Sequence, residues 1–417
     1  MLVNHISHSY SGGGAAIAAR RLHQALLTTG ADSRMTIVKG PDDDRITKFA
    51  PQKTLTRFCQ RECARYLRKK YARKQVKGLA SLGLARSGLS AYLNSQPTQI
   101  INLHWVNSDM ISIAEIGALK HPVVWTFHDM WPFSGAEHVS ELDRWRDGYA
   151  SSDHNGFDVN RWVWKRKASN WKKPFQIVCP SNWLADCVRH SALMRDWPVT
   201  VIPNAIDTEF WAPVAKAEAR AYLSLPQDAP LVLFGAVQAT ADSNKGFTHL
   251  VEAMRRVHVD IPDVQAVVFG SDKIDVEFPY PVHFMGRIRD NRLLKRIYSA
   301  ADVFVLPSRR EVLGYTGVEA MCCGVPVVGF RTSGLSDLVP NQSLGYLAQP
   351  FEAEDLAQGI ASILRNRETG AGRNMSYTAR QHAANRFAEV AVADQYQILY
   401  EKIAVEADAD SSTKPAQ

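Results

Sequence analysis

The sequence lacks any apolar run long enough to cross a lipid bilayer, since its longest apolar runs have the length of strands. Its first residues, MLVNHISHSYSGGG, lack a charged stretch followed by an apolar one, so we expect no secretory signal. The six cysteines form no C-x-x-C pair and no metal-ligand spacing, which favours reduced thiols in a cytoplasmic protein. Hydrophobic residues make up 46% and charged residues 22%, which indicates a globular protein.

The length of the chain predicts two domains, because 417 residues are too many for one hydrophobic core. Short apolar runs alternate with helical patterns along almost the whole chain, which predicts parallel sheets built from βαβ units. The expected strands are 2–7, 33–38, 99–105, 122–128, 176–181 and 199–204 in the first half, and 231–237, 266–270, 282–287, 303–308 and 327–330 in the second.

The resulting prediction is an α/β protein with two Rossmann-like, doubly wound domains that face each other across a cleft. We place the first domain at 1–205 and the second at 206–380, joined through the segment VIPNAIDTEFWAP. A C-terminal helix over 381–405 is expected to pack back on the first domain, and the polar residues 406–417 are expected to form a mobile tail. The carboxyl ends of the strands would then line the ligand site.

The most informative block is 302–338, which reads DVFVLPSRREVLGYTGVEAMCCGVPVVGFRTSGLSDL. An apolar strand leads into a loop that contains Glu311, a helix that opens near a glycine carries Glu319, and a second apolar strand follows. This order directs backbone N–H groups and a helix dipole toward an anion, while carboxylates accept hydrogen bonds from hydroxyl groups. The block therefore predicts a pocket for a ligand that is part phosphate and part polyol.

Three weaker signals follow other expected strands. Gly12, Gly13 and Gly14 open a helix and permit close approach of a ligand, although the G-x-G-x-x-G spacing is absent and a structural turn is the alternative. His128 ends the strand PVVWTFH and can exchange a proton near neutral pH, although a lone histidine at a strand end is more often structural. Lys245 can neutralise phosphate charge or be an ordinary solvated lysine.

Taken in order, these elements resemble retaining glycosyltransferases of the GT-B architecture, family 4, over about residues 1–390. The resemblance rests on the glycine-rich loop, TFHD, VIPNAID, the Lys-Gly pair, FMGR and the block PS-x-x-E-x-x-G-x-x-x-x-E-A-M-x-x-G-x-P-V-V. The last block is highly specific, and the order of the others adds weight. The phrase WTFHDMWPFSG is also similar to transferases of bacterial exopolysaccharide, colanic acid and O-antigen biosynthesis.

The resemblance implies a role for each matching residue around the sugar donor. Glu319 would hold the ribose hydroxyls of the nucleotide, and Glu311 would contact the transferred sugar. Lys245 would neutralise the diphosphate, and Arg287 would lie near the nucleotide base. His128 would contact the sugar and assist catalysis. The backbone amides of Gly314, Tyr315 and Thr316 would meet the sugar and the diphosphate, and the loop of Gly13 and Gly14 would approach the donor phosphate or the acceptor.

One departure concerns the positive charge at the diphosphate. Family members carry an arginine just past the first strand of the second half, where this chain has Ala236. The charge would then rest on Lys245 alone, or on another cation such as Arg309 or Arg310.

The resemblance implies front-face transfer with retention of configuration and without an enzyme nucleophile. We expect no cofactor besides the nucleotide-diphosphate sugar, and no metal, because no D-x-D motif follows a strand and Asp42–Asp44 is more typical of a solvated turn. A glycosidase with two catalytic carboxylates is disfavoured, because Glu311 and Glu319 would serve different ends of the donor.

Two basic segments predict contact with an anionic membrane surface. Residues 53–77 carry ten Lys or Arg, one acid, and apolar residues spaced by three and four, which predicts an amphipathic helix. Residues 161–173 interleave three tryptophans with six cations. The alternative for 53–77 is a solvated helix packed on the first domain by its apolar face. No recognised nucleic-acid module accompanies these charges, so we expect no nucleic-acid partner.

These observations predict a transferase at the inner face of the cytoplasmic membrane that moves a sugar to a lipid-linked saccharide acceptor in cell-surface polysaccharide biosynthesis. Two alternatives stay open. One is a non-catalytic assembly subunit that binds nucleotide sugar or membrane, and the other is a GT-B sugar-nucleotide epimerase or phosphorylase that needs no lipid acceptor.

Overall fold

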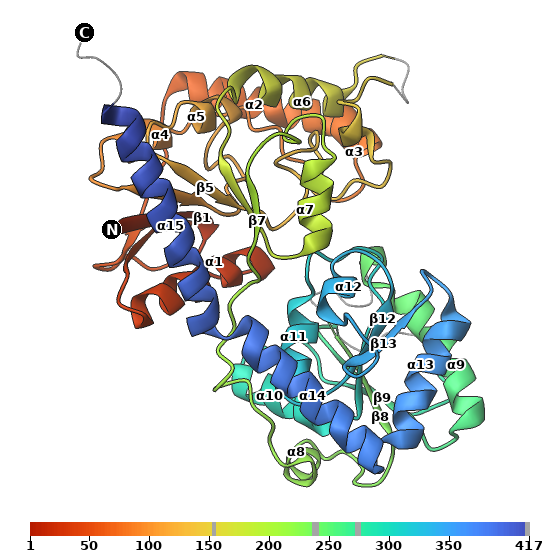
Figure 1. The fold of residues 1–417 in the computed structure, drawn as a ribbon. Helices are drawn as coiled ribbons and strands as arrows, with labels where there is room; N and C mark the ends of the chain where they lie inside the picture. Colours follow the sequence, from red (N-terminus) through yellow and green to blue (C-terminus); the bar gives the residue numbers. More distant parts are fainter. Residues whose placement is uncertain (152–155, 236–241, 272–276, 413–417) are drawn as a thin grey trace. The chain divides into compact units, whose positions relative to one another are not determined.

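The computed structural model describes residues 1–151, 156–235, 242–271 and 277–412, and Figure 1 shows the fold. The chain divides into two compact units, which we treat separately. Unit 1 consists of Met1–Ala205 and Glu389–Gln417, and unit 2 consists of Ile206–Ala388. The chain therefore passes between the units twice, and the first passage lies at the domain boundary expected after residue 205.

Unit 1 contains a seven-stranded sheet of order β3-β2-β1-β4-β5-β6-β7, in which all neighbouring strands are parallel. Its strands are β1 (Leu2–Ser9), β2 (Asp32–Lys39), β3 (Ile46–Lys48), β4 (Ile100–Leu103), β5 (Val123–Thr126), β6 (Gln176–Cys179) and β7 (Val199–Val201). Six of these strands match expected ones. Strand β3 was not expected, because its three residues include a single apolar one, Ile46, and so show no apolar run.

The helices of unit 1 include a long C-terminal one that packs on its sheet. They are α1 (Gly14–Thr28), α2 (Leu55–Leu67), the π-helix η1 (Arg68–Ala72), α3 (Arg73–Gln75), α4 (Leu89–Asn94), α5 (Ile113–Gly117), the 3₁₀-helix η2 (Arg144–Arg146), α6 (Val159–Asn170), α7 (Asn182–Arg189) and α15 (Glu389–Ser412). On α15, the buried Val392 and Tyr396 share a hydrophobic cluster with Val3 of β1 and Val124 of β5.

Unit 2 contains a six-stranded parallel sheet of order β10-β9-β8-β11-β12-β13. Its strands are β8 (Leu231–Gly235), β9 (Gln265–Phe269), β10 (Val282–Phe284), β11 (Val303–Leu306), β12 (Val327–Phe330) and β13 (Gly345–Ala348), of which β13 was not expected. Its helices are α8 (Lys216–Tyr222), the 3₁₀-helix η3 (Ser243–Lys245), α9 (Phe247–Asp260), α10 (Asn291–Ala300), α11 (Tyr315–Cys322), α12 (Leu335–Leu338), α13 (Ala353–Asn366) and α14 (Gly370–Phe387).

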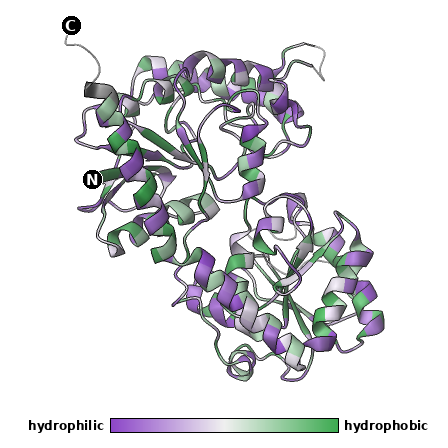
Figure 2. Cartoon of the chain, in the orientation of Figure 1, coloured by the Kyte–Doolittle hydropathy of each residue, from purple (hydrophilic) through white to green (hydrophobic). Residues whose placement is uncertain are grey.

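The core of unit 2 lies on both faces of its sheet, because side chains alternate between the faces along a strand. In β8, Leu231 and Leu233 belong to one hydrophobic cluster, and Val232 and Phe234 belong to the other. Figure 2 shows hydrophobic residues along the strands and polar residues on the outer sides of the helices. The prediction of two Rossmann-like α/β domains is confirmed.

Two of the predicted boundaries near the C-terminus are wrong. Residues 381–388 belong to unit 2 rather than to the returning helix, because α14 continues to Phe387 and buries Ala383 and Phe387 in the unit 2 core. The tail expected over 406–417 is helical as far as Ser412, and 413–417 lie outside the described residues.

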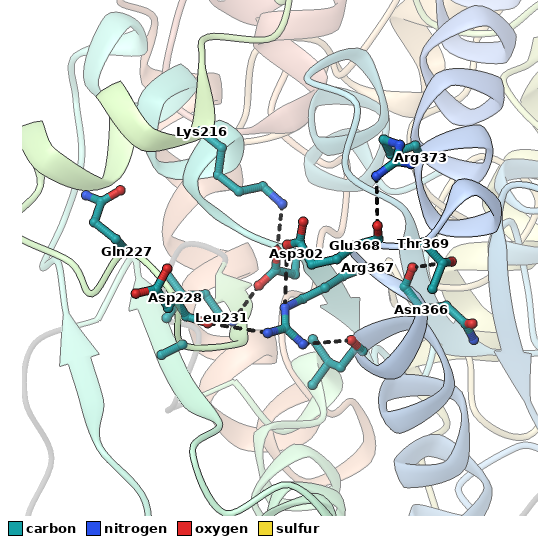
Figure 3. A network of polar contacts seen from close by, with 12 residues as sticks. Lys216, Gln227, Asp228, Leu231, Asp302, Asn366, Arg367, Glu368, Thr369 and Arg373 are labelled. Carbon is teal, nitrogen blue, oxygen red and sulfur yellow. Dashed lines mark hydrogen bonds and ion pairs between the residues drawn. The ribbon is translucent and has the colours of Figure 1, made fainter.

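A buried carboxylate ties together the beginnings of the central strands of unit 2. Asp302 directly precedes β11, and its side chain is 1% exposed. It accepts hydrogen bonds from the Leu231 amide at the start of β8 (2.8 Å), from Lys216 Nζ (2.6 Å) and from the buried Arg220 guanidinium (2.9 Å). Figure 3 shows Lys216 and Leu231 beside Asp302, with Arg367 close by. This network joins α8 to two neighbouring strands.

We expect Asp302→Ala to lower the free energy of unfolding by about 3–5 kcal/mol, because it leaves the buried Arg220 charge without its carboxylate. Urea unfolding followed by circular dichroism measures the loss. The control is Asp228→Ala, since Asp228 is exposed and contacts Arg367 through its backbone carbonyl. Equal stabilities of the two variants would contradict this account of Asp302.

Candidate functional site

The first group of candidate residues lies on α11 and the loop before it. Gly314 caps α11 with a φ of 85°, a left-handed conformation, and a Cβ atom there would lie 2.8 Å from the Leu306 side chain. Tyr315 and Thr316, the first residues of the helix, are half-buried. Glu319 is buried one turn later and accepts a hydrogen bond from the Tyr298 hydroxyl of α10 (3.1 Å). The predicted residues Gly314–Thr316 and Glu319 therefore share one short helix.

Lys245 and Glu311 form an ion pair of 2.6 Å between Nζ and Oε1. The same Glu311 oxygen accepts a hydrogen bond from the Ser308 hydroxyl (3.0 Å). Burial lowers the pKa of Lys245, but the charge and hydrogen bond of Glu311 outweigh it, so the pKa is raised above its ordinary value. The resemblance assigns these side chains to different parts of a donor, and the structure places them in direct contact.

The position of Lys245 follows from close backbone packing between two loops. Asn244 exchanges side-chain hydrogen bonds with the backbone of Arg310, and its carbonyl accepts a hydrogen bond from the Arg309 amide. Gly246 has a φ of 70°, and a Cβ atom there would lie 1.9 Å from the Pro307 carbonyl oxygen. Glycine is therefore required after the lysine, because any side chain would separate the loops.

Both cations expected to replace the missing arginine, Arg309 and Arg310, lie in the loop after β11; Arg309 is exposed and Arg310 is half-buried. Ala236 itself lies outside the described residues. The Arg309 guanidinium lies 4.6 Å from the centre of the Phe351 ring. Burial, and then the Arg309 charge, lower the pKa of His249 in the first turn of α9, so Arg309 is close to that turn. Arg287 is exposed after the edge strand β10, which is separated from β11 by β9 and β8.

In unit 1, His128 follows β5 and is the end of a row of three imidazoles. His104 Nδ1 lies 3.0 Å from His128 Nε2, and His5 Nδ1 lies 3.0 Å from His104 Nε2. Burial lowers the pKa of all three, to about 4 for His128. His128 is thus neutral at pH 7. The sequence did not single out His5 and His104, because only strand register brings them to His128.

The glycine-rich loop precedes α1 in the same unit. Gly12 and Gly13 have φ values of 94° and 114°, and Gly13 caps the helix without a side-chain hydrogen bond. A Cβ atom at Gly12, Gly13 or Gly14 would meet nothing within 4 Å. Packing therefore does not demand these glycines, whereas the backbone conformation at the first two favours them.

The membrane-facing patch expected at 161–173 stays a prediction: Lys165, Lys172 and Lys173 are exposed, whereas other side chains of the segment are buried. Lys167 is fully buried and donates hydrogen bonds to the backbone carbonyls of Trp131, Ser134 and Gly135. Trp171 is 3% exposed. The other two tryptophans of the segment, Trp162 and Trp164, are half-buried.

Comparisons with known proteins agree with this geometry. Residues 12–210 match the model "Glycosyltransferase Family 4", and residues 216–382 match "Glycosyl transferases group 1". The chain belongs to the GT-B glycosyltransferases. A curated relative, alpha-maltose-1-phosphate synthase of Mycolicibacterium smegmatis, is 26% identical over 71% of this chain and 81% of its own length.

Two solved structures share the GT-B fold. HepE of Anabaena in complex with UDP-glucose aligns with a TM-score of 0.64 and 16% identity, covering 96% of this chain and 100% of that one. WaaG, a glycosyltransferase involved in lipopolysaccharide biosynthesis, aligns with a TM-score of 0.62 and 15% identity, covering 95% and 99%. At these identities the likeness concerns the fold.

The described residues contain neither a candidate metal site nor a candidate membrane span. No group of three or more His, Cys, Asp or Glu among them is arranged to hold a metal ion. No described helix combines the length and the hydropathy needed to span a bilayer.

The buried histidines of unit 1 predict loss of stability in mild acid. Burial lowers the pKa of His23 and His128 to about 4 from an ordinary value of 6.5, and lowers those of His5 and His104 well below it. Between pH 6.5 and 4 the unfolded chain therefore binds more protons than the folded chain, so the free energy of unfolding falls as pH falls through this window.

Urea midpoints measured across this pH range test the prediction. His23→Gln should make the dependence shallower, because one buried imidazole no longer takes up a proton on unfolding. The control is His190→Gln, at an exposed histidine, which should leave the slope unchanged. A slope that His23→Gln does not alter would contradict the assignment.

Proposed function

We propose that this protein is a retaining, metal-independent hexosyltransferase that moves a sugar from a nucleotide-diphosphate sugar to a saccharide acceptor. Unit 2 binds the donor, and unit 1 binds the acceptor. The observation that carries the proposal is the Lys245–Glu311 pair beside the N-terminus of α11, whose next turn carries Glu319. This arrangement brings a cation from the loop before α9 to the helix N–H groups and two carboxylates of α11 and the loop before it.

The chemistry of transfer explains why such an arrangement is useful. Cleavage of the anomeric C–O bond develops negative charge on the departing diphosphate, and a fixed cation with oriented N–H groups stabilises that charge without reorganisation. In the proposal, the bound diphosphate replaces Glu311 as the ion-pair partner of Lys245. Glu311 then accepts hydrogen bonds from the sugar hydroxyls. Glu319 holds the ribose.

The acceptor is proposed to be lipid-linked, with the protein peripheral at the inner face of the cytoplasmic membrane in cell-surface polysaccharide biosynthesis. The support comes from α2. Leu55, Phe58 and Tyr66 are 79%, 61% and 57% exposed, and exposed cations lie along the same helix. The buried side of α2 is formed by Arg57 and Ala64 instead. The alternative that the apolar face of 53–77 packs on its own domain accounts for Leu67 and Tyr71, which are half-buried, and not for these three exposed side chains.

A panel of UDP-sugars and GDP-sugars, tested by thermal shift and then by turnover with a membrane extract as acceptor source, tests the transfer. We expect Lys245→Met to lower kcat about 100- to 1,000-fold, because it removes charge stabilisation worth about 2.7–4 kcal/mol. Glu319→Ala should raise the donor KM about 10- to 100-fold, because it removes hydrogen bonds to a charged carboxylate.

Glu354→Ala is the matched control, because Glu354 is exposed at the start of α13. A donor that binds but is never turned over with extract present would favour the non-catalytic assembly subunit. Turnover without any extract would favour an epimerase or phosphorylase.

Sedimentation with lipid vesicles tests whether the protein binds an anionic membrane surface. We expect binding to vesicles that contain anionic phospholipid and little binding to neutral ones, because about 1 kcal/mol accrues per basic residue near an anionic surface. Phe58→Glu should weaken binding at least tenfold, whereas Val259→Glu, at a 78% exposed valine of α9, should not. Equal binding to neutral and anionic vesicles would contradict the proposal.

A further inference from the structure

The row of three histidines in unit 1 is built by the register of three neighbouring strands. His5 of β1 pairs with Asn102 of β4, and Asn102 pairs with Val124 of β5. His104 lies two residues beyond Asn102, and His128 lies four beyond Val124. Because successive side chains of a strand point to opposite faces, all three imidazoles lie on the same face of the sheet. His5 lies farthest from the carboxyl edge of the sheet, and His128 lies nearest to it.

This face is covered by α1 and α15, which also enclose the row. These helices place two rings beside His5: His23 of α1, with ring centres 6.1 Å apart, and Tyr400 of α15, at 6.5 Å. Tyr400 itself bonds to Asn102 (2.5 Å), and Tyr396 lies 3.0 Å from the Thr126 hydroxyl. The successive imidazole planes are inclined by only 29° and 19°. The two inner histidines of the row, His5 and His104, are therefore buried, and His128 is half-buried.

The two hydrogen bonds of the row allow two arrangements of protons on the rings. Burial lowers the pKa of these histidines, so each ring carries a single proton at neutral pH. In the first, all three protons lie on Nδ1, so His5 donates to His104 and His104 donates to His128. In the second, all three lie on Nε2, so His128 donates to His104 and His104 donates to His5. No mixed arrangement satisfies both 3.0 Å contacts with one proton each.

The inner end of the row decides between these arrangements. His5 Nε2 is buried without a hydrogen-bond partner among the described residues. With protons on Nε2, this position would be an orphaned buried N–H donor, which is rare in proteins. With protons on Nδ1, it is a lone pair without a donor, which is tolerated more often. The proton on Nδ1 is therefore the favoured arrangement.

We propose that His5 and His104 are positioning residues that lock His128 with its proton on Nδ1, so that His128 acts on substrate as a hydrogen-bond donor and not as a base. The role at substrate rests on the proposed function. His128 is half-buried, and its Nδ1 has no hydrogen-bond partner within the described part of the chain, so this N–H is available to a sugar or phosphate oxygen. Its Nε2 lone pair is occupied by His104.

Long-range ¹H–¹⁵N spectra of the full chain, labelled with ¹⁵N-histidine, test the tautomer without substrate. The nitrogen shifts and couplings report which ring nitrogen carries the proton. His128→Gln and His104→Asn assign the signals. We expect His128 as the Nδ1–H form at neutral pH, and an Nε2–H or doubly protonated His128 would overturn the proposal.

Turnover tests the positioning role, with the nucleotide sugar that reacts fastest in the donor panel. His104→Asn keeps a side-chain N–H that can donate to His128 Nε2, whereas His104→Phe fills similar space without a donor. We expect His104→Phe to lower kcat about 100-fold with little change in donor KM, since small displacements of a reacting group have effects of that size. His104→Asn should recover most of that loss.

The outcomes separate this inference from the proposed function. If His128→Ala is inactive but folded His104→Phe keeps the kcat of the unmodified protein, the positioning role is wrong and the transferase assignment stands. If His128→Ala keeps full activity, the role of His128 in transfer is wrong. Thermal denaturation shows whether each variant is folded, and the spectra of the unmodified chain decide the tautomer if a variant is not.

Discussion

Parallel pairing of neighbouring strands is the constraint on which the candidate groups of both units depend. A parallel sheet brings the carboxyl ends of adjacent strands to one edge, so loops far apart in the sequence meet there. In unit 1, this edge joins His104 to His128. In unit 2, the segment after β8 meets the loop after β11, and Lys245 contacts Glu311. A register shift of one residue would send a whole strand's side chains to the opposite face.

Burial then determines what each polar group is able to do. Lys167 is surrounded by backbone carbonyls and the Trp131 ring, so it stabilises the loop after β5 and is not available to a ligand. Lys245 is half-buried, and its partner is the carboxylate of Glu311. Lys167 lies within α6 and Lys245 lies in the loop before α9, and their partners are backbone carbonyls in the first case and a carboxylate in the second.

In helix α2, the usual burial of apolar residues and exposure of charged ones is partly reversed. The apolar residues of an amphipathic helix usually face the core, and the charged residues face solvent. Here Arg57 is buried and donates hydrogen bonds to the carbonyls of Arg86 and Asp109, while Leu55 and Phe58 are exposed. Helix α2 therefore exposes apolar side chains beside its cations.

Periodicity in the sequence was enough to predict two α/β domains, eleven of their strands and the block that holds Glu311 and Glu319. These features are local, because strand length, alternation and motif spacing lie within short windows. The short strands β3 and β13 and the end of α14 were missed, since weak local signals there are decided by packing.

Only the tertiary structure revealed that Lys245 pairs with Glu311, that Trp171 is buried, and that His5 and His104 stand behind His128. Each depends on contacts between residues far apart in the chain. Sequence spacing determines which residues share a strand or a helix face, whereas register and packing between elements determine which of them touch.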